Sequence, residues 1–408
     1  MNIQRLPIAA DLSLSAVLAG VVATLIAYAG PLVIVFQAAQ GLSPALLQSW
    51  VWAISIGSGV LGLLLSLHYR VPLVIAWSVP GSALLITLLP TVGFAEAVGA
   101  YLIASLVTCI VGMTGTLDLI FRKLPAGISA AMLAGILFGF AAKMFYVLPA
   151  EPFLVGTMFT AFFLGRRWLP RYAIVIVLIV GCMVTVLGGK MSGTVPTLQF
   201  TLPTWTSPQF DWHAIINIAL PLTIVGLTGQ WVPGMAVIRS CGYSHPNASP
   251  LIAWSSLVSA LLAPFGCHGL NLATFTAAIC TGEDAHRDPS KRYIAGVSGS
   301  LLYIVLGSFS ATVLSFLAML PKELIAALAG LALFPTIANS LAASMADTKD
   351  RDASLVTFVV SASGMSLFGL GAAFWGLFFG IAAHFLLHWH PFTRLLPKHA
   401  PESKERKS

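Results

Sequence analysis

Five long stretches of the chain contain no Asp, Glu, Lys or Arg, and they constrain the fold more than any other feature. They are residues 12–69, 71–95, 240–282, 293–321 and 353–393. A helix that spans a bilayer needs about 20 mostly apolar residues, so each stretch can hold at least one. Only 9% of the residues are charged and 58% are hydrophobic, which leaves too few charges to cover a soluble surface. The sequence therefore predicts an all-α integral membrane protein and excludes a cytosolic enzyme, a nucleic-acid-binding protein or a disordered chain.

The apolar runs predict fourteen membrane-spanning segments. Their centres are expected near residues 25, 56, 80, 106, 136, 158, 180, 225, 257, 274, 306, 332, 361 and 380. If the N-terminus is inside, all 21 Lys and Arg residues except Lys143, Lys190 and Lys322 lie on the inner side, as the positive-inside rule requires. Both termini are therefore expected in the cytoplasm, with residues 397–408 forming a disordered tail.

The two halves of the chain resemble each other. Gly-Pro at residues 30–31 precedes Gly-Leu-Ser at 41–43, and Val-Pro at 232–233 precedes Gly-Tyr-Ser at 242–244. We expect one repeat in residues 1–195 and another in residues 196–396, with chance similarity of small-residue helices as the alternative. Because seven segments are an odd number, the second repeat must be inverted, and inverted repeats are typical of secondary transporters.

The third expected segment, residues 71–85, contains helix-breaking residues. Pro72 and the Pro80-Gly81 pair favour an extended piece that is followed by a half-helix. Ser78 is placed to cap this half-helix, whose free N–H groups and positive dipole end would attract an anion. A simple proline kink is the alternative interpretation.

The equivalent place in the second half is residues 264–276, where His268 is flanked by glycines and followed by polar residues. Asn271 could cap a second half-helix, and two such helix ends would form a carboxylate-sized site with aromatic walls. Gln230 could bind substrate there or bond a neighbouring helix, and its repeat counterpart, Tyr28, could supply an aromatic wall. The candidate substrate-binding residues are Tyr28, Trp77, Ser78, Pro80, Gly81, Ser82, Gln230, Gly269, Asn271 and Thr274.

His268 is the one titratable residue expected beside the broken helices. It could be a structural residue or a proton relay, since its pKa range suits proton transfer. The charged residues of the 283–292 stretch are expected in a solvated inner loop. The five cysteines lack metal-ligand spacing and no nucleotide-binding or hydrolase motif is present, so we expect no disulfide, metal or cofactor.

Several of these strings resemble the benzoate–proton symporter (BenE) family. They are Ala-Trp-Ser-Val-Pro-Gly at residues 76–81, and the runs at 131–137, 276–280 and 372–377. The resemblance covers essentially the whole chain and implies the fold of uracil permeases and sulfate-type carriers. In that fold segments 1–4 and 8–11 form a core domain, segments 5–7 and 12–14 form a gate domain, and segments 3 and 10 are short strands plus half-helices.

The resemblance implies a secondary importer of an aromatic carboxylate anion with a proton, in a bacterial inner membrane. The nucleobase branch has acids on segments 8 and 10 where Gln230 and Asn271 are found here, which argues against a uracil-type substrate. A nucleobase or inorganic-anion transporter and a passive anion channel remain the alternatives. We expect contact with membrane lipid, none with nucleic acid, and allow for a homodimer.

Overall fold

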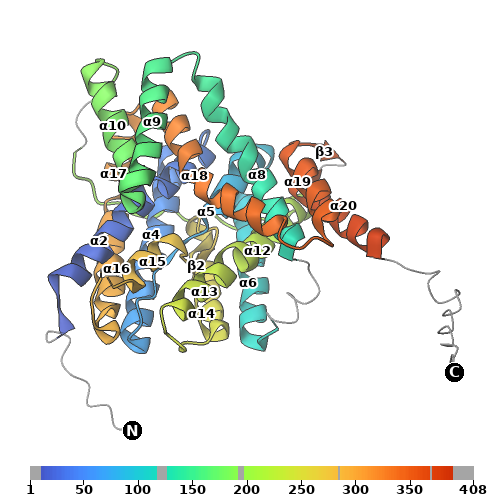
Figure 1. The fold of residues 1–408 in the computed structure, drawn as a ribbon, viewed down its shortest axis with the longest axis horizontal. Helices are drawn as coiled ribbons and strands as arrows, with labels where there is room; N and C mark the ends of the chain where they lie inside the picture. Colours follow the sequence, from blue (N-terminus) through green and yellow to red (C-terminus); the bar gives the residue numbers. More distant parts are fainter. Residues whose placement is uncertain (1–10, 117–125, 192–196, 284, 368–369, 389–408) are drawn as a thin grey trace, which may run out of the picture.

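The computed structural model describes residues 11–116, 126–191, 197–283, 285–367 and 370–388, which are mostly helical (Figure 1). The first half contains α2 Leu14–Ala29, α3 Pro31–Ala38, α4 Pro44–Tyr69, β1 Ile75–Trp77, α5 Val79–Leu88, η1 Leu89–Thr91, α6 Phe94–Thr114, α8 Ala126–Val147, α9 Pro152–Trp168, η2 Pro170–Tyr172 and α10 Ala173–Leu187. The second half begins with α11 Trp212–Ala214, η3 Ile215–Ala219, α12 Leu220–Gly226, η4 Leu227–Trp231, α13 Val232–Ser240, α14 Ala248–Leu262, η5 Ala263–Phe265, β2 Leu270–Leu272 and α15 Phe275–Thr281. It ends with η6 Pro289–Lys291, α16 Tyr293–Ser308, α17 Ser310–Ala318, α18 Lys322–Ser344, α19 Arg351–Ala362, β3 Ser366–Leu367, β4 Leu370–Gly371 and α20 Ala372–His388.

Many of these helices have the length and composition of membrane spans. Among the described residues seven are long and apolar enough, or eight if the bent pair around residue 309 counts as one. Residue 274 lies between β2 and α15, and every other expected centre lies within a helix. The count of fourteen crossings stays a prediction, and the expected tail, residues 397–408, lies outside the described residues.

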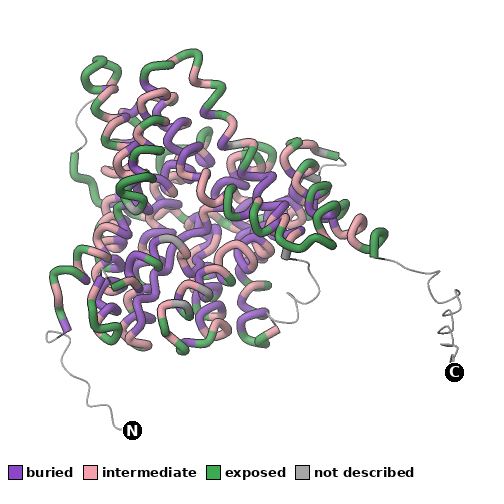
Figure 2. Tube along the Cα trace, in the orientation of Figure 1, coloured by how far each residue is buried: buried purple, intermediate pink, exposed green. Residues whose placement is uncertain are grey.

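Many large apolar residues are exposed, and exposed residues lie along much of the outside of the helices (Figure 2). Met113, Leu187 and Leu386 are each more than 70% exposed. A soluble monomer rarely exposes apolar patches of such extent. The outer surface of the helices is therefore suited to lipid contact, as the composition predicts.

The helices pack in two sets (Figure 1). In one set α2 and α4 pack on α16, α6 packs on α14, and β1 and β2 lie between them. In the other set α8 packs on α18 and α19, α19 on α20, and α9 on α10. The sets meet where α5 and η4 contact α8, and where α3 contacts α18.

Small residues allow the helices of the first set to approach closely. A Cβ built on Gly20 of α2 would lie 2.1 Å from the carbonyl oxygen of Ala295 in α16. Thr24, one turn further along α2, donates a hydrogen bond to the Gly299 carbonyl at 3.0 Å. Close glycine contacts with interhelical hydrogen bonds are the usual means of helix association in a membrane, and they hold the frame around the two strands.

Candidate functional site

The two broken segments meet through an antiparallel pair of strands. In β1 and β2, Ala76 lies opposite Asn271 and Trp77 lies opposite Leu270. The pairing continues beyond the strands, because the Ser78 N–H donates to the Gly269 carbonyl at 3.2 Å. The predicted extended pieces of segments 3 and 10 are therefore confirmed, and their pairing satisfies backbone groups that would otherwise be unpaired inside the protein.

The first half-helix, α5, begins as the sequence predicts. Ser78 is its N-cap and accepts a hydrogen bond from the Gly81 N–H at 3.0 Å, while Pro80 lies in the first turn. Gly81 has little room, because a Cβ there would lie 2.7 Å from Leu222 of α12. The close contact explains the glycine, and the cap uses one of the N–H groups that an anion would otherwise bind.

The second half-helix, α15, begins differently from the prediction. Asn271 does not cap it, because Asn271 lies within β2 and the helix begins at Phe275. The N-cap position is taken by Thr274, whose side chain makes no capping hydrogen bond and whose buried hydroxyl has no partner among the residues that the structure describes. Gly269, with φ of +132°, provides the backbone turn that leads into β2. At the second break, the segment of β2 and α15, the N-cap hydroxyl is therefore unpaired, whereas at the first break, the segment of β1 and α5, it is paired.

His268 joins the two broken segments through its ring. The Trp50 indole N–H donates to His268 Nδ1 at 3.0 Å, and His268 Nε2 lies 2.8 Å from Ser82 Oγ and 3.2 Å from the Ser78 carbonyl oxygen. Because Nδ1 accepts a hydrogen bond, the proton of the neutral ring is on Nε2. A second proton, on Nδ1, would point at the Trp50 N–H. Of the two roles that the sequence left open, these contacts favour the structural one.

Tyr28 and Trp77 belong to a buried aromatic cluster. The two ring centroids are 5.8 Å apart, and Tyr303 of α16 lies 5.9 Å from Tyr28 and 5.8 Å from Trp77. The Tyr28 hydroxyl donates to Ser55 Oγ at 2.6 Å. The cluster packs α2, β1 and α16 together. Both predicted residues therefore lie next to the strand crossing, the place where β1 pairs with β2.

Gln230 lies between the strand crossing and the second set of helices. It is in the π-helical turn η4, a kind of irregularity that is frequent at functional sites. A Cβ built on Gly226 would lie 3.3 Å from Asn271 Oδ1, and one on Gly229 would lie 3.0 Å from Leu133 of α8. Within the described part of the chain, neither the Gln230 amide nor the Asn271 amide has a hydrogen-bond partner.

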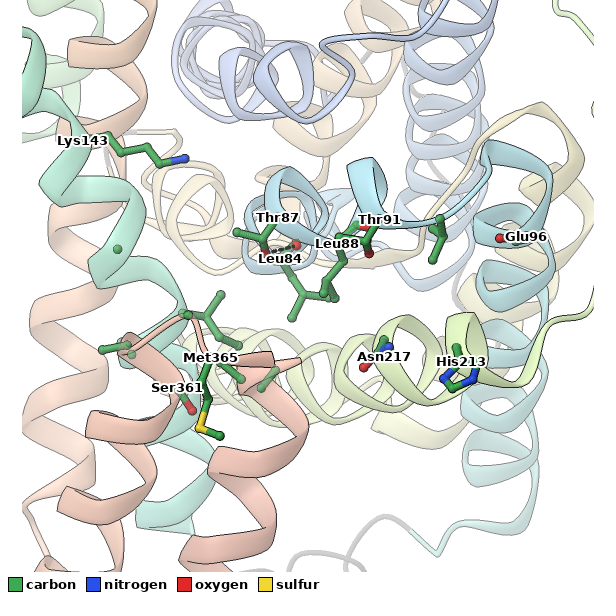
Figure 3. Close-up of a pocket in the computed structure, with 18 of the residues that line it drawn as sticks. Leu84, Thr87, Leu88, Thr91, Glu96, Lys143, His213, Asn217, Ser361 and Met365 are labelled. Atoms are coloured by element: carbon green, nitrogen blue, oxygen red, sulfur yellow. Dashed lines mark hydrogen bonds between the residues drawn. The ribbon is translucent and has the colours of Figure 1, made fainter. Parts of the chain in front are cut away.

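A large cavity does not reach the predicted site residues. It has a volume of about 620 Å³ and lies between α5, α6, α8, η3 and the turn that joins α19 to α20 (Figure 3). Its polar lining includes Glu96, Lys143, Asp211, His213 and Asn217. The volume suits a small-molecule site, and sequence reasoning did not identify any of these lining residues.

The smaller cavity has a volume of about 30 Å³, enough for one water molecule. Ser78, His268, Gly269 and Asn271 line it together with hydroxyl-bearing residues of α6 and α14. The predicted residues are thus brought together around the strand crossing, but no space for a substrate is open there. The contact between Leu133 and Gly229 closes α8 against this region, close to Gly135 and Ile136 of the larger cavity.

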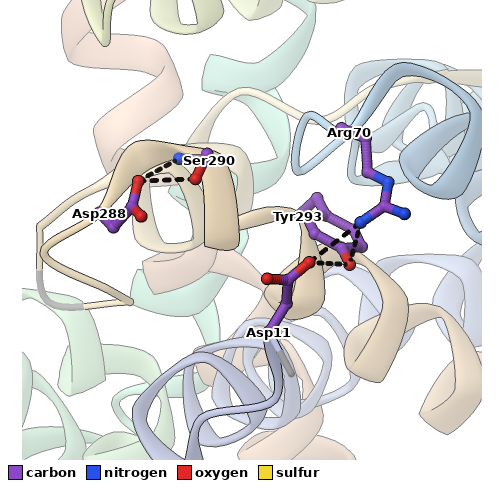
Figure 4. A network of polar contacts seen from close by, with 5 residues as sticks. All are labelled: Asp11, Arg70, Asp288, Ser290 and Tyr293. Carbon is purple, nitrogen blue, oxygen red and sulfur yellow. Dashed lines mark hydrogen bonds and ion pairs between the residues drawn. The ribbon is translucent and has the colours of Figure 1, made fainter. Parts of the chain in front are cut away.

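A polar network fixes the helix ends on the predicted inner side (Figure 4). Arg70 donates to Asp11 at 3.0 Å and to the Tyr293 hydroxyl at 2.5 Å, and that hydroxyl donates to Asp11 at 2.9 Å. Asp11 is buried, and sequence reasoning gave it no role. In the nearby 283–292 stretch the expectation of solvated charges is wrong for Arg292, which is buried and donates to the Thr281 and His286 carbonyls.

Comparison with known proteins adds the family. Residues 10–386 match the family model described as benzoate membrane transport protein (BenE). The chain is 44% identical over 379 residues to the benzoate membrane transport protein of Acinetobacter baylyi, covering 92% of this chain and 96% of that protein. It is 37% identical over 373 residues to the inner membrane protein YdcO of Escherichia coli, covering 91% and 95%.

A solved structure shows a similar fold. The transmembrane domain of the cyanobacterial bicarbonate transporter BicA matches with a TM-score of 0.60 over 92% of this chain and 96% of that domain. The sequence identity is 15%, so this likeness concerns the fold alone. The family and the fold are those of membrane transporters and not of enzymes.

Proposed function

This chain belongs to the benzoate membrane transport protein (BenE) family, and from that premise we propose that it imports benzoate or a related aromatic carboxylate together with a proton. It is a multi-pass membrane transporter in which the strand crossing of β1 and β2 lies among the helices. The proposed substrate site is at this crossing, beside α15 and η4.

The observation that carries this assignment is the set of unpaired donors at the second break. Asn271 is 6% exposed as a residue and its amide makes no hydrogen bond within the described residues, and the Thr274 hydroxyl is buried without a partner there. A buried polar group without a partner is costly unless a ligand or water satisfies it. Both groups can donate to a carboxylate, and Gln230 adds a third donor close by.

The half-helices contribute to the proposed site unequally. In α5, Pro80 has no N–H, Ser78 caps Gly81, and the Ser78 N–H is used by Gly269. The dipole of α5 still favours an anion, but most of its donors are occupied. The direct hydrogen bonds to the carboxylate are therefore assigned to Asn271, Thr274 and Gln230, with Tyr28 and Trp77 as the nearby aromatic wall.

We further propose that the two packed sets of helices are the core and the gate that the family fold implies. The larger cavity lies between them and includes Lys143, which the charge distribution places outside. In this proposal it is the outer vestibule, and the Leu133–Gly229 contact separates it from the site. Movement of α8 away from η4 would then open the site to the vestibule.

The route of the proton stays a hypothesis with two forms. His268 could take it, as the sequence suggests, but protonation at Nδ1 would set two N–H donors against each other. The alternative is that the substrate itself carries the proton and crosses as the neutral acid, which lowers the cost of moving a charge through the membrane. The contacts of His268 support the second form.

The location and assembly stay predictions as well. A bacterial inner membrane with both termini in the cytoplasm follows from the charge distribution and the family. Labelling single cysteines with an impermeant reagent in intact cells should mark a cysteine at Lys190 and spare one at Arg166. The reverse pattern would invert the topology. A homodimer is the assembly to test by light scattering.

A thermal-shift measurement on purified protein tests the substrate class. A ligand that binds the folded state raises the melting temperature, so benzoate should stabilise the protein, while uracil and bicarbonate at equal concentration should not. Cyclohexane carboxylate, which has the charge but not the aromatic ring, is the matched control and should stabilise less. Stabilisation by uracil or bicarbonate without any by benzoate would contradict the proposal.

A further inference from the structure

Three side chains with metal-binding atoms gather at one end of the α19–α20 pair. Asp350 immediately precedes α19, and His384 and His388 lie one turn apart near the end of α20. Residues four apart share a face of a helix. The ligand atoms of the three residues all lie within 4.8 Å of one another, far from the strand crossing along the chain and outside both cavities.

The spacing of these atoms suits a single ion. Asp350 Oδ1 lies 2.7 Å from His384 Nδ1 and 3.7 Å from His388 Nε2. In a tetrahedral zinc site with bonds of about 2.0–2.1 Å, neighbouring ligand atoms are about 3.4 Å apart. The observed distances lie on either side of this value, so side-chain rotation is enough to form the site and no backbone movement is needed.

The hydrogen bonds of the cluster already orient two of the ligands. His388 Nδ1 donates to the His384 carbonyl at 2.8 Å, which leaves the Nε2 lone pair free on the side of Asp350. A second ring nitrogen bonded to a backbone carbonyl is the usual arrangement for a metal-binding histidine. Asp350 occupies the N-cap position of α19 but makes no capping hydrogen bond, so its carboxylate is available to the histidines.

We propose that Asp350, His384 and His388 bind a divalent transition-metal ion of the zinc type, with water completing the coordination. Two imidazoles and one carboxylate suit Zn²⁺, Co²⁺ or Ni²⁺ better than Mg²⁺ or Ca²⁺, which prefer oxygen ligands. The side chains are between 15% and 37% exposed, so an ion can reach them from solvent. The bound ion would tie the end of α20 to the connection between α18 and α19.

Metal binding has a signature that an ion pair lacks. In the metal-free protein His384 Nδ1 bonds to Asp350, and a metal that binds this nitrogen would replace that hydrogen bond. Co²⁺ should give the visible absorption of a low-symmetry, four-coordinate site.

Equilibrium dialysis of the full chain, purified without a histidine tag, against Zn²⁺ tests the proposal. We expect one ion per chain, and His388→Gln should weaken binding by at least about tenfold, since loss of a mere supporting contact already costs 10–100-fold. His388→Gln is the sharpest variant because it leaves the His384–Asp350 ion pair in place. His286→Gln is the matched control, because His286 lies in a loop and its ring bonds backbone groups of Asp288.

Zinc-dependent stabilisation provides the second readout. Zn²⁺ should raise the melting temperature of the wild type and of His286→Gln, but not that of His388→Gln, whose metal-free stability should match the wild type. Absence of Zn²⁺ binding by the wild type, or equal binding by His388→Gln, would overturn the proposal and leave an ion pair between α19 and α20. If His388→Gln does not fold, Asp350→Asn serves as the second variant, with the same expectation for Zn²⁺ binding and for zinc-dependent stabilisation.

Discussion

The two broken segments have the same outline but differ in how their polar groups are paired. In the first, Ser78 caps α5 and bonds Gly269, and Ser82 and the Ser78 carbonyl contact His268. In the second, Thr274 caps nothing and its buried hydroxyl has no partner among the described residues, where the Asn271 amide makes no hydrogen bond either. The strand pairing therefore joins a segment whose serine side chains are paired to one whose N-cap hydroxyl is open, although the Trp77 indole N–H of the first segment is also buried without a partner among the described residues.

This difference suggests a division of labour between the repeats. Side chains with satisfied hydrogen bonds specify one arrangement, so the paired Ser78 and Ser82 of the first break would hold the crossing in shape. A segment with unpaired donors is stabilised when a ligand supplies the acceptor. Substitutions in the first break should therefore affect stability, and substitutions in the second should affect transport.

The largest effect is expected from Asn271→Ala. If the amide donates to the substrate carboxylate, its loss removes a hydrogen bond to a charged group, worth about 1.5–3 kcal/mol. The apparent affinity for benzoate should fall by about 10- to 150-fold, while the melting temperature of the ligand-free protein stays close to that of the wild type. Competition binding with labelled benzoate measures the first quantity.

Asn247→Ala is the control for this change. Asn247 is exposed before α14 and makes no capping hydrogen bond, so its replacement should leave both quantities unchanged. Wild-type affinity in Asn271→Ala would move the substrate site away from the second break.

A smaller effect is expected from Thr274→Val, which keeps the side-chain shape and removes the hydroxyl. A neutral donor contributes about 0.5–1.5 kcal/mol, so benzoate affinity should fall by about 2- to 12-fold. The ligand-free protein should become no less stable, because the hydroxyl is buried without a partner. A clear loss of stability with unchanged affinity would show that Thr274 has a structural role instead.

The opposite pattern is expected from Ser78→Ala in the first break. Loss of an N-cap side chain costs about 1 kcal/mol of stability, which should appear as a lower midpoint of unfolding. Benzoate affinity should change by less than in Thr274→Val, since the Ser78 hydroxyl bonds the Gly81 N–H and not the ligand. If Ser78→Ala reduces affinity more than Thr274→Val does, the proposed division between the two breaks is wrong.

The smallest effect of all is expected from His268→Gln, which should leave proton coupling unchanged. Because Trp50 donates to Nδ1, the ring should remain neutral during transport, and uptake should keep its stimulation by external acid. The pH dependence of initial uptake rates in vesicles measures this. Loss of that stimulation, with benzoate exchange retained, would show instead that His268 carries the proton.

The sequence predicted the parts of the site that depend on local signals. Pro80 and Gly81 after a run that could extend, with a serine before them, indicate a capped half-helix whatever surrounds it. The predicted capping role of Asn271 was wrong, because asparagine favours both helix caps and irregular segments. Pairing with Ala76 places Asn271 in the strand β2 instead. Local preference is overridden where a distant segment supplies the hydrogen bonds.

The remaining contacts could not be read from the sequence, because they join residues that are far apart along the chain. Trp50 and His268 are 218 residues apart, and nothing near Trp50 distinguishes it from the other tryptophans. Asp11 is a single acidic residue that precedes a long apolar run. Its burial depends on hydrogen bonds from Arg70 and Tyr293, which lie far away along the chain. The larger cavity likewise forms between elements from both halves.

The central claim is that benzoate enters with a proton, and initial uptake rates in vesicles of purified protein test it most directly. Benzoic acid crosses bilayers unaided, so rates are compared with protein-free vesicles and with vesicles of Asn271→Ala. The account predicts a protein-dependent rate that rises when the outside is made acidic. At equal pH on both sides of the membrane, an imposed positive-inside potential should not increase this rate. A protein-dependent rate that rises with the positive-inside potential and ignores the pH gradient would contradict it, and would make this chain a passive pathway for the benzoate anion.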